Sequence, residues 1–570
     1  MKRSFLGCLA ATSAITALAC ALYLPFLGNP LAFDDLPFFS GAKFAYYATT
    51  PFGLGLRLLP YFTLAFPQVM WGVFPPLNHA EIHRIIGLGF HVAVSLTIYK
   101  LVYDLLLASG TTSRASPLSE AKLNAHVLAF IGAAAFAIHP AAVYAAGYVV
   151  QRTTLLATFF SLLSVIYFAR GFKRDSHADA ITAALFYALT VFSKEHSVLL
   201  PAAAVMVTPL VANDRRFAIR HVALYLIACF PAAAIVVVLI RGVIGSAYEP
   251  NVQFILAEIH GIPLLETAGG PWLVSAITQT GVFFKYLAYW LLPDTAAMSV
   301  DVRIDFVQSW SPGWIALKLA VFLVFGVAGL LLLVRRGRAG LIGFGMLYFW
   351  VLFFVELSSV RFQEPLVIYR SYLWAPGIVV ALAAMLSGIP RKAALALFVI
   401  VSPLLFYQAV DRLRSFSSAS ALWEDAAAKL PATPIPGGAR ALHNLARAQV
   451  MDEKPDSALA TLKRCMSLYP RTFYCNFASG ATYVRLERYQ EALPYLERAL
   501  KIVPGSNMSH YHLGIALEKL GRVDEARQAY REASRLGFAG GDYRLELMDS
   551  PSTGGERVLY DRFRSVHKPE

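Results

Sequence analysis

Two adjacent acids, Asp34 and Asp35, follow directly on the first long apolar stretch of the chain, within the sequence LGNPLAFDDLPFF at 27–39. A carboxylate within hydrogen-bonding reach of a hydroxyl can take its proton as the oxygen attacks an electrophile. Two neighbouring carboxylates allow one to accept the proton while the other orients the site or binds a divalent cation. The residues leave open whether a cation takes part. They also leave a second interpretation, in which the pair is solvated loop acids or a helix cap before LPFF.

The composition places these acids in a membrane protein. Of the 570 residues, 57% are hydrophobic and only 15% are charged, and several apolar runs approach the ~20 residues needed to cross a bilayer. The net charge of +14 does not indicate a nucleic-acid-binding protein, because the basic residues form short clusters between apolar runs. Such clusters, at 173–174, 215–216, 335–338 and 391–392, are typical of cytoplasmic loops.

The apolar stretches and their flanking charges predict about eleven membrane spans in an all-α fold. The spans lie near residues 4–26, 82–107, 124–140, 153–170, 180–192, 196–212, 221–241, 314–334, 340–357, 372–388 and 393–410. The segment at 275–292 carries Lys285 at its centre and two tyrosines, which predicts a re-entrant or interfacial segment. If Lys2 and Arg3 stay in the cytoplasm, every basic cluster is then cytoplasmic as well.

This topology gathers a set of polar residues on the opposite, outer face. The set comprises Asp34, Asp35, His139, Arg152, Lys194, Glu195, Asp301 and the segment 364–372, which contains Arg370 and Tyr372. Several of them stand at opposite ends of consecutive spans and can therefore converge. Any one of them could instead anchor a helix end in the headgroup layer, but a whole set on one face favours a functional site.

The C-terminal part of the chain has a different organisation. After residue 416 the charges become frequent, the long apolar runs disappear, and a 34-residue period brings Ala446, Gly480 and Gly514 into register. Small residues at helix crossings with this period resemble tetratricopeptide repeats, of which we expect about three over 439–540. The predicted domains are therefore a membrane domain at 1–410, a linker at 411–438, the repeats, and a mobile tail at 541–570. Within the linker we expect a helix containing Trp423, followed by a stiff connection at PATPIPGG, 431–438.

The five cysteines include no CxxC pair and no spacing typical of a metal site. Cys465 and Cys475 fall on the last helix of one repeat and the first helix of the next. They could form a disulfide if the repeats face an oxidising compartment, or could simply pack as two small residues in a helix interface.

The order of motifs resembles a known family. FDD after the first span, HPAAVYAAGYVVQR at 139–152, SKEH at 193–196, YRSYL at 369–373 and the repeats occur in this order, and the segment at 78–99 looks like the family's second span. Together they resemble the transmembrane and tetratricopeptide repeat-containing mannosyltransferases and their bacterial relatives, membrane glycosyltransferases of the GT-C fold.

The resemblance implies transfer of a sugar, with mannose expected, from a polyprenyl-phosphate donor to a hydroxyl acceptor such as a protein Ser or Thr, with inversion. Asp34 and Asp35 would then be catalytic, with Asp34 as the base and Asp35 in support. A developing phosphate charge needs Arg or Lys beside it, which Arg152, Lys194 and Arg370 can supply. His139, Glu195 and Tyr372 complete the expected donor site. No metal ligand set and no cofactor is assigned.

Two departures from the family pattern bear on the site. Many relatives have an acid inside the HP motif where this chain has Tyr144, so an acid or metal role there is not expected, and His139 with Pro140 could simply end a span. In YRSYLWAPG the family's Arg, Tyr and Leu are kept, but the proline that follows them is displaced to Pro376.

Two rival functions stay open. A lipid-linked oligosaccharide transferase or ligase would use the same phosphate site, and the mass of the transferred group distinguishes it. A non-catalytic membrane anchor whose repeats recruit partners for envelope assembly would tolerate replacement of both acids. A transporter is disfavoured because the ionisable groups lie near span ends and not at mid-depth. The expected location is a bacterial inner membrane, with the site and the repeats on the periplasmic side. The expected partners are the lipid-linked donor, a protein or glycan acceptor and the bilayer, with protein binding through the repeats.

Overall fold

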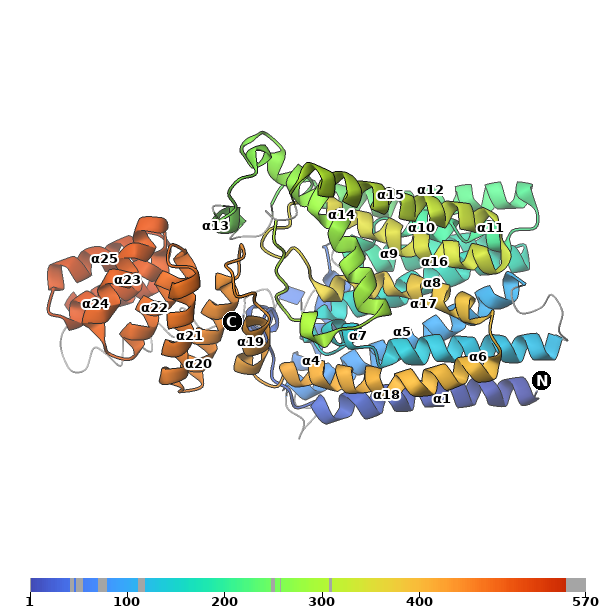
Figure 1. Ribbon diagram of the computed structural model, residues 1–570, viewed down its shortest axis with the longest axis horizontal. Coiled ribbons are helices and arrows are strands. Elements are labelled where there is room, and N and C mark those ends of the chain that lie inside the picture. Colours follow the sequence, from blue (N-terminus) through green and yellow to red (C-terminus); the bar gives the residue numbers. More distant parts are fainter. Residues whose placement is uncertain are drawn as a thin grey trace.

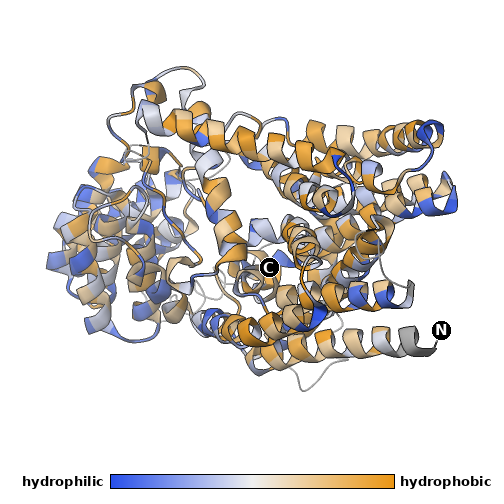
Figure 2. Cartoon of the chain, turned by 45° about the vertical axis from the view of Figure 1, so that its right-hand side comes forward, coloured by the Kyte–Doolittle hydropathy of each residue, from blue (hydrophilic) through white to orange (hydrophobic). Residues whose placement is uncertain are grey.

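The computed structural model describes residues 2–40, 46–47, 55–69, 79–110, 118–247, 252–256, 258–306 and 310–549. These residues form an all-α protein in which a bundle of long apolar helices is followed by a stack of shorter amphipathic ones (Figure 1). Within the described ranges β-pairing amounts to one antiparallel bridge between Val302 and Leu366. Figure 2 shows the same division as a change from largely apolar bundle helices to mixed repeats.

Fourteen helices build the membrane domain in the described part of the chain. They are α1 (Lys2–Tyr23), α5 (His79–Ala108), α6 (Leu118–Ala137), α7 (Pro140–Ala146), α8 (Arg152–Arg174), α9 (Ala178–Ser193), α10 (Leu200–Val205), α11 (Thr208–Val211), α12 (Arg215–Leu239), α14 (Gly270–Leu291), α15 (Pro312–Val334), α16 (Gly337–Phe353), α17 (Ala375–Leu386) and α18 (Arg391–Ser415). Three short helices, α2 (Asp35–Ser40), α4 (Leu58–Val69) and α13 (Val252–Leu256), lie outside this set.

Seven stretches of the described residues are long and apolar enough to cross a membrane. They are Gly7–Phe26, Ala80–Ala108, Val149–Arg174, Arg215–Leu239, Pro312–Val334, Gly337–Leu357 and Arg391–Ser415, and each coincides with a predicted span. The predicted span at 124–140 becomes a bent pair, α6 and α7, with an angle of 63° between them. The bend follows from Pro140, which stands at the start of α7 and cannot continue the hydrogen bonding of α6.

The three other predicted spans are shorter apolar helices. Residues 180–192 form α9, residues 372–388 contain α17, and residues 196–212 are broken into η4 (Glu195–Ser197), α10 and α11. Helix α17 packs closely on α16: a Cβ atom on Gly345 would lie 2.3 Å from the carbonyl oxygen of Gly377. Small residues permit such packing.

The predicted interfacial segment is the helix α14. It is continuous over 22 residues and, as predicted, is not among the helices that are apolar enough to span. In Figure 1 it runs across the direction of α15 and α18, at the end of the bundle nearest the repeats. One face of α14 is buried against α15 and against the 3₁₀ turn η7 (Phe354–Leu357).

The basic clusters and the repeats lie at opposite ends of the bundle. The turn between α15 and α16 contains Arg335 and Arg336, and α18 begins with Arg391 and Lys392. Both places lie at the end of the bundle that also holds the N-terminus, whereas α18 leads at its other end into the repeats (Figure 1).

The soluble domain begins immediately after α18 and contains α19 (Ala419–Ala428), α20 (Ala439–Met451), α21 (Pro455–Leu468), α22 (Phe473–Arg485), α23 (Tyr489–Ile502), α24 (Asn507–Lys519), α25 (Val523–Arg535) and α26 (Ala539–Asp549). Consecutive helices from α20 to α25 form three helix pairs, as the 34-residue period predicts. Gly480 and Gly514 stand where a Cβ atom would clash with Leu496 and Tyr530 of the paired helix, so small residues are required there.

The predicted linker at 411–438 contains the helix expected around Trp423, which is α19. Trp423 packs with residues of α20, so this segment is part of the fold. Helix α26 extends the stack to Asp549, into the predicted tail, and residues 550–570 lie outside the described residues. Cys465 and Cys475 form a disulfide with their Cα atoms 5.6 Å apart, which joins the end of α21 to the start of α22.

Candidate functional site

A cavity of about 440 Å³ lies between the end of the helix bundle and the first repeat helix. Most of its lining is polar or aromatic, and it includes four cations and two acids. The lining residues are Phe33, Asp34, Phe38, Arg57, Tyr61, Val150, Gln151, Thr153, Lys194, His196, Gln363, Glu364, Tyr369, Arg370 and Arg440. Three of the eight residues predicted from the sequence, Asp34, Lys194 and Arg370, are among them.

Asp34 is the predicted acid that faces the cavity. It lies in the turn before α2, where its backbone N–H donates to the hydroxyl of Tyr148 at 2.7 Å. Burial raises the pKa of the Asp34 carboxyl above its ordinary value, and the negative charge of Glu364 raises it further. Within the described part of the chain its side chain forms no ion pair. A carboxylate of raised basicity that is accessible from a cavity is suited to accept a proton.

Asp35 points away from the cavity and is fully buried. Its two carboxyl oxygens accept the backbone N–H groups of Ala32 at 3.2 Å and Val150 at 2.7 Å. These bonds tie the turn that carries Asp34 to the 3₁₀ turn η3 (Val149–Gln151) at the start of α8. Burial raises the pKa of Asp35 to about 7. The geometry therefore gives Asp35 a positioning role beneath Asp34.

Lys194 brings a cation to the cavity wall. It occupies the extended residue between α9 and η4, and its side chain is almost completely buried. The Nζ atom donates to Gln151 Oε1 at 3.0 Å and Thr154 Oγ1 at 2.6 Å, and lies 4.7 Å from the centre of the Tyr369 ring. Among the described residues no carboxylate lies within ion-pair distance of it. Burial, and after it the neighbouring positive charge of Arg57, holds the pKa of Lys194 well below its ordinary value.

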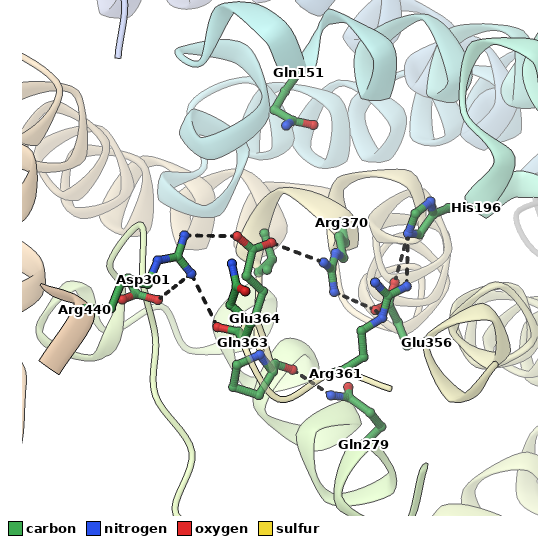
Figure 3. Close-up of polar contacts among 12 residues, drawn as sticks. Gln151, His196, Gln279, Asp301, Glu356, Arg361, Gln363, Glu364, Arg370 and Arg440 are labelled. Atoms are coloured by element: carbon green, nitrogen blue, oxygen red, sulfur yellow. Dashed lines mark hydrogen bonds and ion pairs between the residues drawn. The ribbon is translucent and has the colours of Figure 1, made fainter. Parts of the chain in front are cut away.

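Arg370 also lines the cavity, but its charge is compensated. It lies in η8 (Ile368–Leu373), and Nη1 donates to Glu356 Oε2 at 2.9 Å while Nη2 lies 3.6 Å from Glu364 Oε2 (Figure 3). Glu356 is fully buried and has two further neighbours, Arg361 at 3.5 Å and His196 at 3.7 Å. The guanidinium therefore holds a buried acid in place.

Glu195 lies behind the cavity wall and pairs with Arg57. The Arg57 guanidinium donates hydrogen bonds to both carboxyl oxygens of Glu195, and its Nε lies 2.9 Å from one of them. Arg57 itself lines the cavity, just before α4. Glu195 therefore fixes the position of a cation that sequence reasoning missed.

Arg152, predicted to contact the donor, is a structural residue in this fold. It is buried, and its guanidinium donates to the backbone carbonyls of Thr63 at 2.5 Å and His83 at 2.8 Å. These bonds join the start of α8 to α4 and α5. Arg152 is not part of the cavity lining.

His139 and Tyr372 also lie outside the lining. His139 caps α7, accepting the N–H of Ala141 at 3.2 Å, and stacks on Trp290 with ring centres 4.5 Å apart. This is the alternative in which His139 and Pro140 end a span. The hydroxyl of Tyr372 is buried and lies 2.7 Å from Nδ1 of His91.

Arg440 is the lining residue that sequence reasoning had least chance of finding. It belongs to α20 in the first repeat, and its guanidinium lies 3.3 Å from Glu364 and 3.8 Å from Asp301 (Figure 3). It also lies over the ring of Phe33, 5.2 Å from its centre. Its place in a 34-residue repeat gives no indication that it meets the membrane domain. Glu364, in contrast, falls within the segment predicted for the outer face.

Metal-ligand side chains do not cluster in the described residues: no group of three or more His, Cys, Asp or Glu lies close enough together to hold an ion. Tyr144, which stands where relatives have an acid, is buried and accepts a hydrogen bond from Arg412 at 3.4 Å.

Comparisons with known proteins identify the repeats. A family model described as tetratricopeptide repeat matches residues 477–537. No curated protein matches the sequence. Among solved structures, the chain is similar to the archaeal oligosaccharyltransferase AglB from Archaeoglobus fulgidus, solved with an inhibitory peptide and a dolichol-phosphate, at 14% identity and a TM-score of 0.38. The match covers 81% of this chain and 60% of AglB.

A MamA RS-1 ArsTM double mutant is similar to a smaller part, with 20% identity, a TM-score of 0.20, and coverage of 23% of this chain and 74% of that one. The apolar helices of the bundle and the matched repeat family together show an all-α protein with a membrane-helical domain and C-terminal tetratricopeptide repeats.

Proposed function

We propose that this chain is a membrane glycosyltransferase of the GT-C type that moves a sugar from a polyprenyl-phosphate donor to a hydroxyl acceptor. One observation carries the proposal: the Asp34 carboxylate and the Lys194 ammonium face the same cavity, and among the described residues neither has an oppositely charged group within ion-pair distance. Transfer from a lipid phosphate to a hydroxyl needs both a proton acceptor and a cation. The motif order of the sequence, which resembles the GT-C mannosyltransferases, supports the same reaction.

The proposed reaction is a single displacement. Asp34 takes the proton of the acceptor hydroxyl as its oxygen forms a bond to the anomeric carbon of the sugar. The bond between that carbon and the phosphate oxygen breaks, and its electron pair stays on the phosphate. Lys194 stabilises this charge. Attack from the side opposite the phosphate inverts the configuration of the anomeric carbon.

The position of the cavity suits a membrane-anchored donor. It lies at the end of the bundle away from the basic clusters, which favour the cytoplasm. The Cys465–Cys475 disulfide lies on the same side, and disulfides persist in oxidising compartments. We therefore propose that the cavity and the repeats face the periplasm or an equivalent outer compartment. Mannose as the sugar and a protein Ser or Thr as the acceptor are proposed from the sequence resemblance.

Intact-mass analysis of envelope proteins from cells with and without the chain tests the function. A protein that loses a single hexose increment when the chain is deleted, and regains it with the wild type but not with Asp34→Asn, would support the proposal. A lost mass equal to a whole oligosaccharide would favour a lipid-linked oligosaccharide transferase. Restoration by a double Asn variant at Asp34 and Asp35 would favour the scaffold alternative and would contradict catalysis.

A further inference from the structure

One bulky residue in the turn that carries Asp34 has an unfavourable backbone conformation. Phe33 has a positive φ angle of 52°, in the left-handed region that bulky side chains rarely adopt. This conformation costs free energy, so it persists only where surrounding contacts hold it. Because Phe33 immediately precedes Asp34, its backbone conformation affects where the Asp34 carboxyl points.

The Phe33 ring contacts two side chains of the soluble domain. It meets the indole of Trp423 on α19 edge to face, with ring centres 5.5 Å apart, and the guanidinium of Arg440 on α20 lies 5.2 Å from its centre. Phe33 also packs against the apolar core that α19 to α22 form. An aromatic pair and a cation over a ring each add to the free energy of apolar burial. The soluble domain therefore supplies contacts that hold a ring of the membrane domain.

The two helices that contact Phe33 are themselves fixed to the membrane domain by ion pairs. On α19 the carboxyl of Asp425 lies 2.9 Å from the guanidinium of Arg412 on α18. On α20 the guanidinium of Arg440 lies 3.3 Å from Glu364 (Figure 3). The side chains around the Phe33 ring therefore have defined positions relative to the helix bundle and the cavity.

We infer that the soluble domain positions the proposed base: α19 and α20 hold the ring of Phe33, and Phe33 holds the turn that presents Asp34 to the cavity. Phe33 and its two partners are then positioning residues, which act on the reaction through Asp34. A displacement of a reacting group by about 1 Å can lower a rate ~10²-fold, so loss of these contacts should appear in turnover. The role of Asp34 as base rests on the proposed function, whereas the hold on the turn can be measured without it.

Hydrogen exchange of the full chain in nanodiscs measures the hold on the turn. The Asp35 N–H donates to the carbonyl of Ala32 at 3.0 Å, and the Leu36 N–H donates to the carbonyl of Phe33 at 3.2 Å. Exchange of these two amides therefore reports opening of the turn. We expect Phe33→Leu and Trp423→Leu each to speed it about 10-fold, within the range for loss of an aromatic pair and part of its buried area. The double variant should exchange no faster than the single ones, because both substitutions remove the same contact.

Phe159→Leu is the matched control, because it removes a half-buried ring from α8 that does not line the cavity. Its turn should exchange like that of the parent. Exchange of α24 and α25 in the same samples reports the fold of the repeats. If Trp423→Leu disturbs that fold, Phe33→Leu decides alone, because it changes only the membrane domain. Unchanged exchange in Phe33→Leu, fully additive effects in the double variant, or an equal effect in Phe159→Leu would overturn the inference.

Transfer kinetics distinguish positioning from stability. Phe33→Leu should lower kcat by ~10-fold or more and leave KM for the donor within twofold, at an unfolding temperature close to that of the parent. A kcat within twofold of the parent despite faster exchange would overturn the positioning role. If exchange changes as expected but the wild type transfers no sugar, the proposed function fails while the hold of the soluble domain on the turn stands.

Discussion

Lys194 and Arg370 offer the sharpest contrast in this site, because both cations line the cavity but only Arg370 has a buried acid as partner. We expect Lys194→Met to lower kcat by ~10²–10³, the range for losing one donor to a developing oxyanion. The fold should not suffer, because the substitution removes a buried charge that has no counter-ion and keeps a similar volume. Thermal unfolding of the variant should therefore occur at the same temperature or higher.

Arg370→Met should fail in a different way. It leaves the fully buried Glu356 without its 2.9 Å partner, with Arg361 at 3.5 Å and His196 at 3.7 Å as the remaining neighbours. Breaking a buried pair from one side costs ~3–5 kcal/mol, so we expect low yield or a lower unfolding temperature. A double variant, Arg370→Met with Glu356→Gln, removes the stranded acid and should recover stability.

The assay for both sites is release of polyprenyl phosphate from a synthetic donor by purified protein, together with thermal unfolding in the same detergent. Exposed Lys463, on α21, provides a neutral control as Lys463→Met. Wild-type turnover in Lys194→Met would refute the assignment of the phosphate to this lysine. A stable Arg370→Met protein without turnover would instead assign phosphate binding to Arg370, as the sequence motif predicts.

Three further outcomes are expected. Asp34→Asn should keep expression and unfolding temperature but lower the transfer rate by at least ~10². Asp35→Asn should lower the free energy of unfolding by ~1–3 kcal/mol, because one of the two backbone N–H groups that Asp35 accepts then faces the amide NH₂. Equal stability of both variants would contradict these two roles. The pH profile of kcat/KM should be bell-shaped and narrower than the ordinary pKa values of Asp and Lys would give. Asp34 must be ionised and its pKa is raised, whereas Lys194 must be protonated and its pKa is lowered. Lys194→Arg should move the alkaline limb to higher pH, and an unmoved limb would exclude Lys194 as the group that titrates there. Alkylation of freshly isolated membranes should label Cys465 and Cys475 only after reduction, and two free thiols before reduction would refute the disulfide. Replacing both cysteines by Ser should destabilise the repeats by ~3 kcal/mol, the chain-entropy value for a loop of 10 residues.

The sequence predicts the class of this fold well, because hydropathy and a 34-residue period report directly on burial and on repeated helix crossings. It predicts full-length spans where the structure has shorter apolar helices: the first half of α17 is buried against other helices, and hydropathy does not distinguish that environment from lipid. The 63° bend between α6 and α7 depends on Pro140, whose presence is visible in the sequence but whose angle is set by packing.

Candidate site residues are harder to predict, since pairing is a tertiary property. Lys194 and Glu195 are neighbours in sequence, but Glu195 binds Arg57 and leaves Lys194 open toward the cavity. Arg370 lines the cavity, but its pairing with Glu356, on the preceding span, cannot be predicted from spacing. Arg440 enters the cavity only because the repeats dock on the bundle.

The central claim is tested most directly by one in vitro reaction. Purified chain in nanodiscs is given a synthetic polyprenyl-phosphate mannose and a serine-containing peptide, and the mass and anomeric configuration of the product are measured. The account predicts a peptide heavier by one hexose, with inverted configuration, formed by the wild type and not by Asp34→Asn. A product of retained configuration, or equal product from wild type and Asp34→Asn, would contradict it.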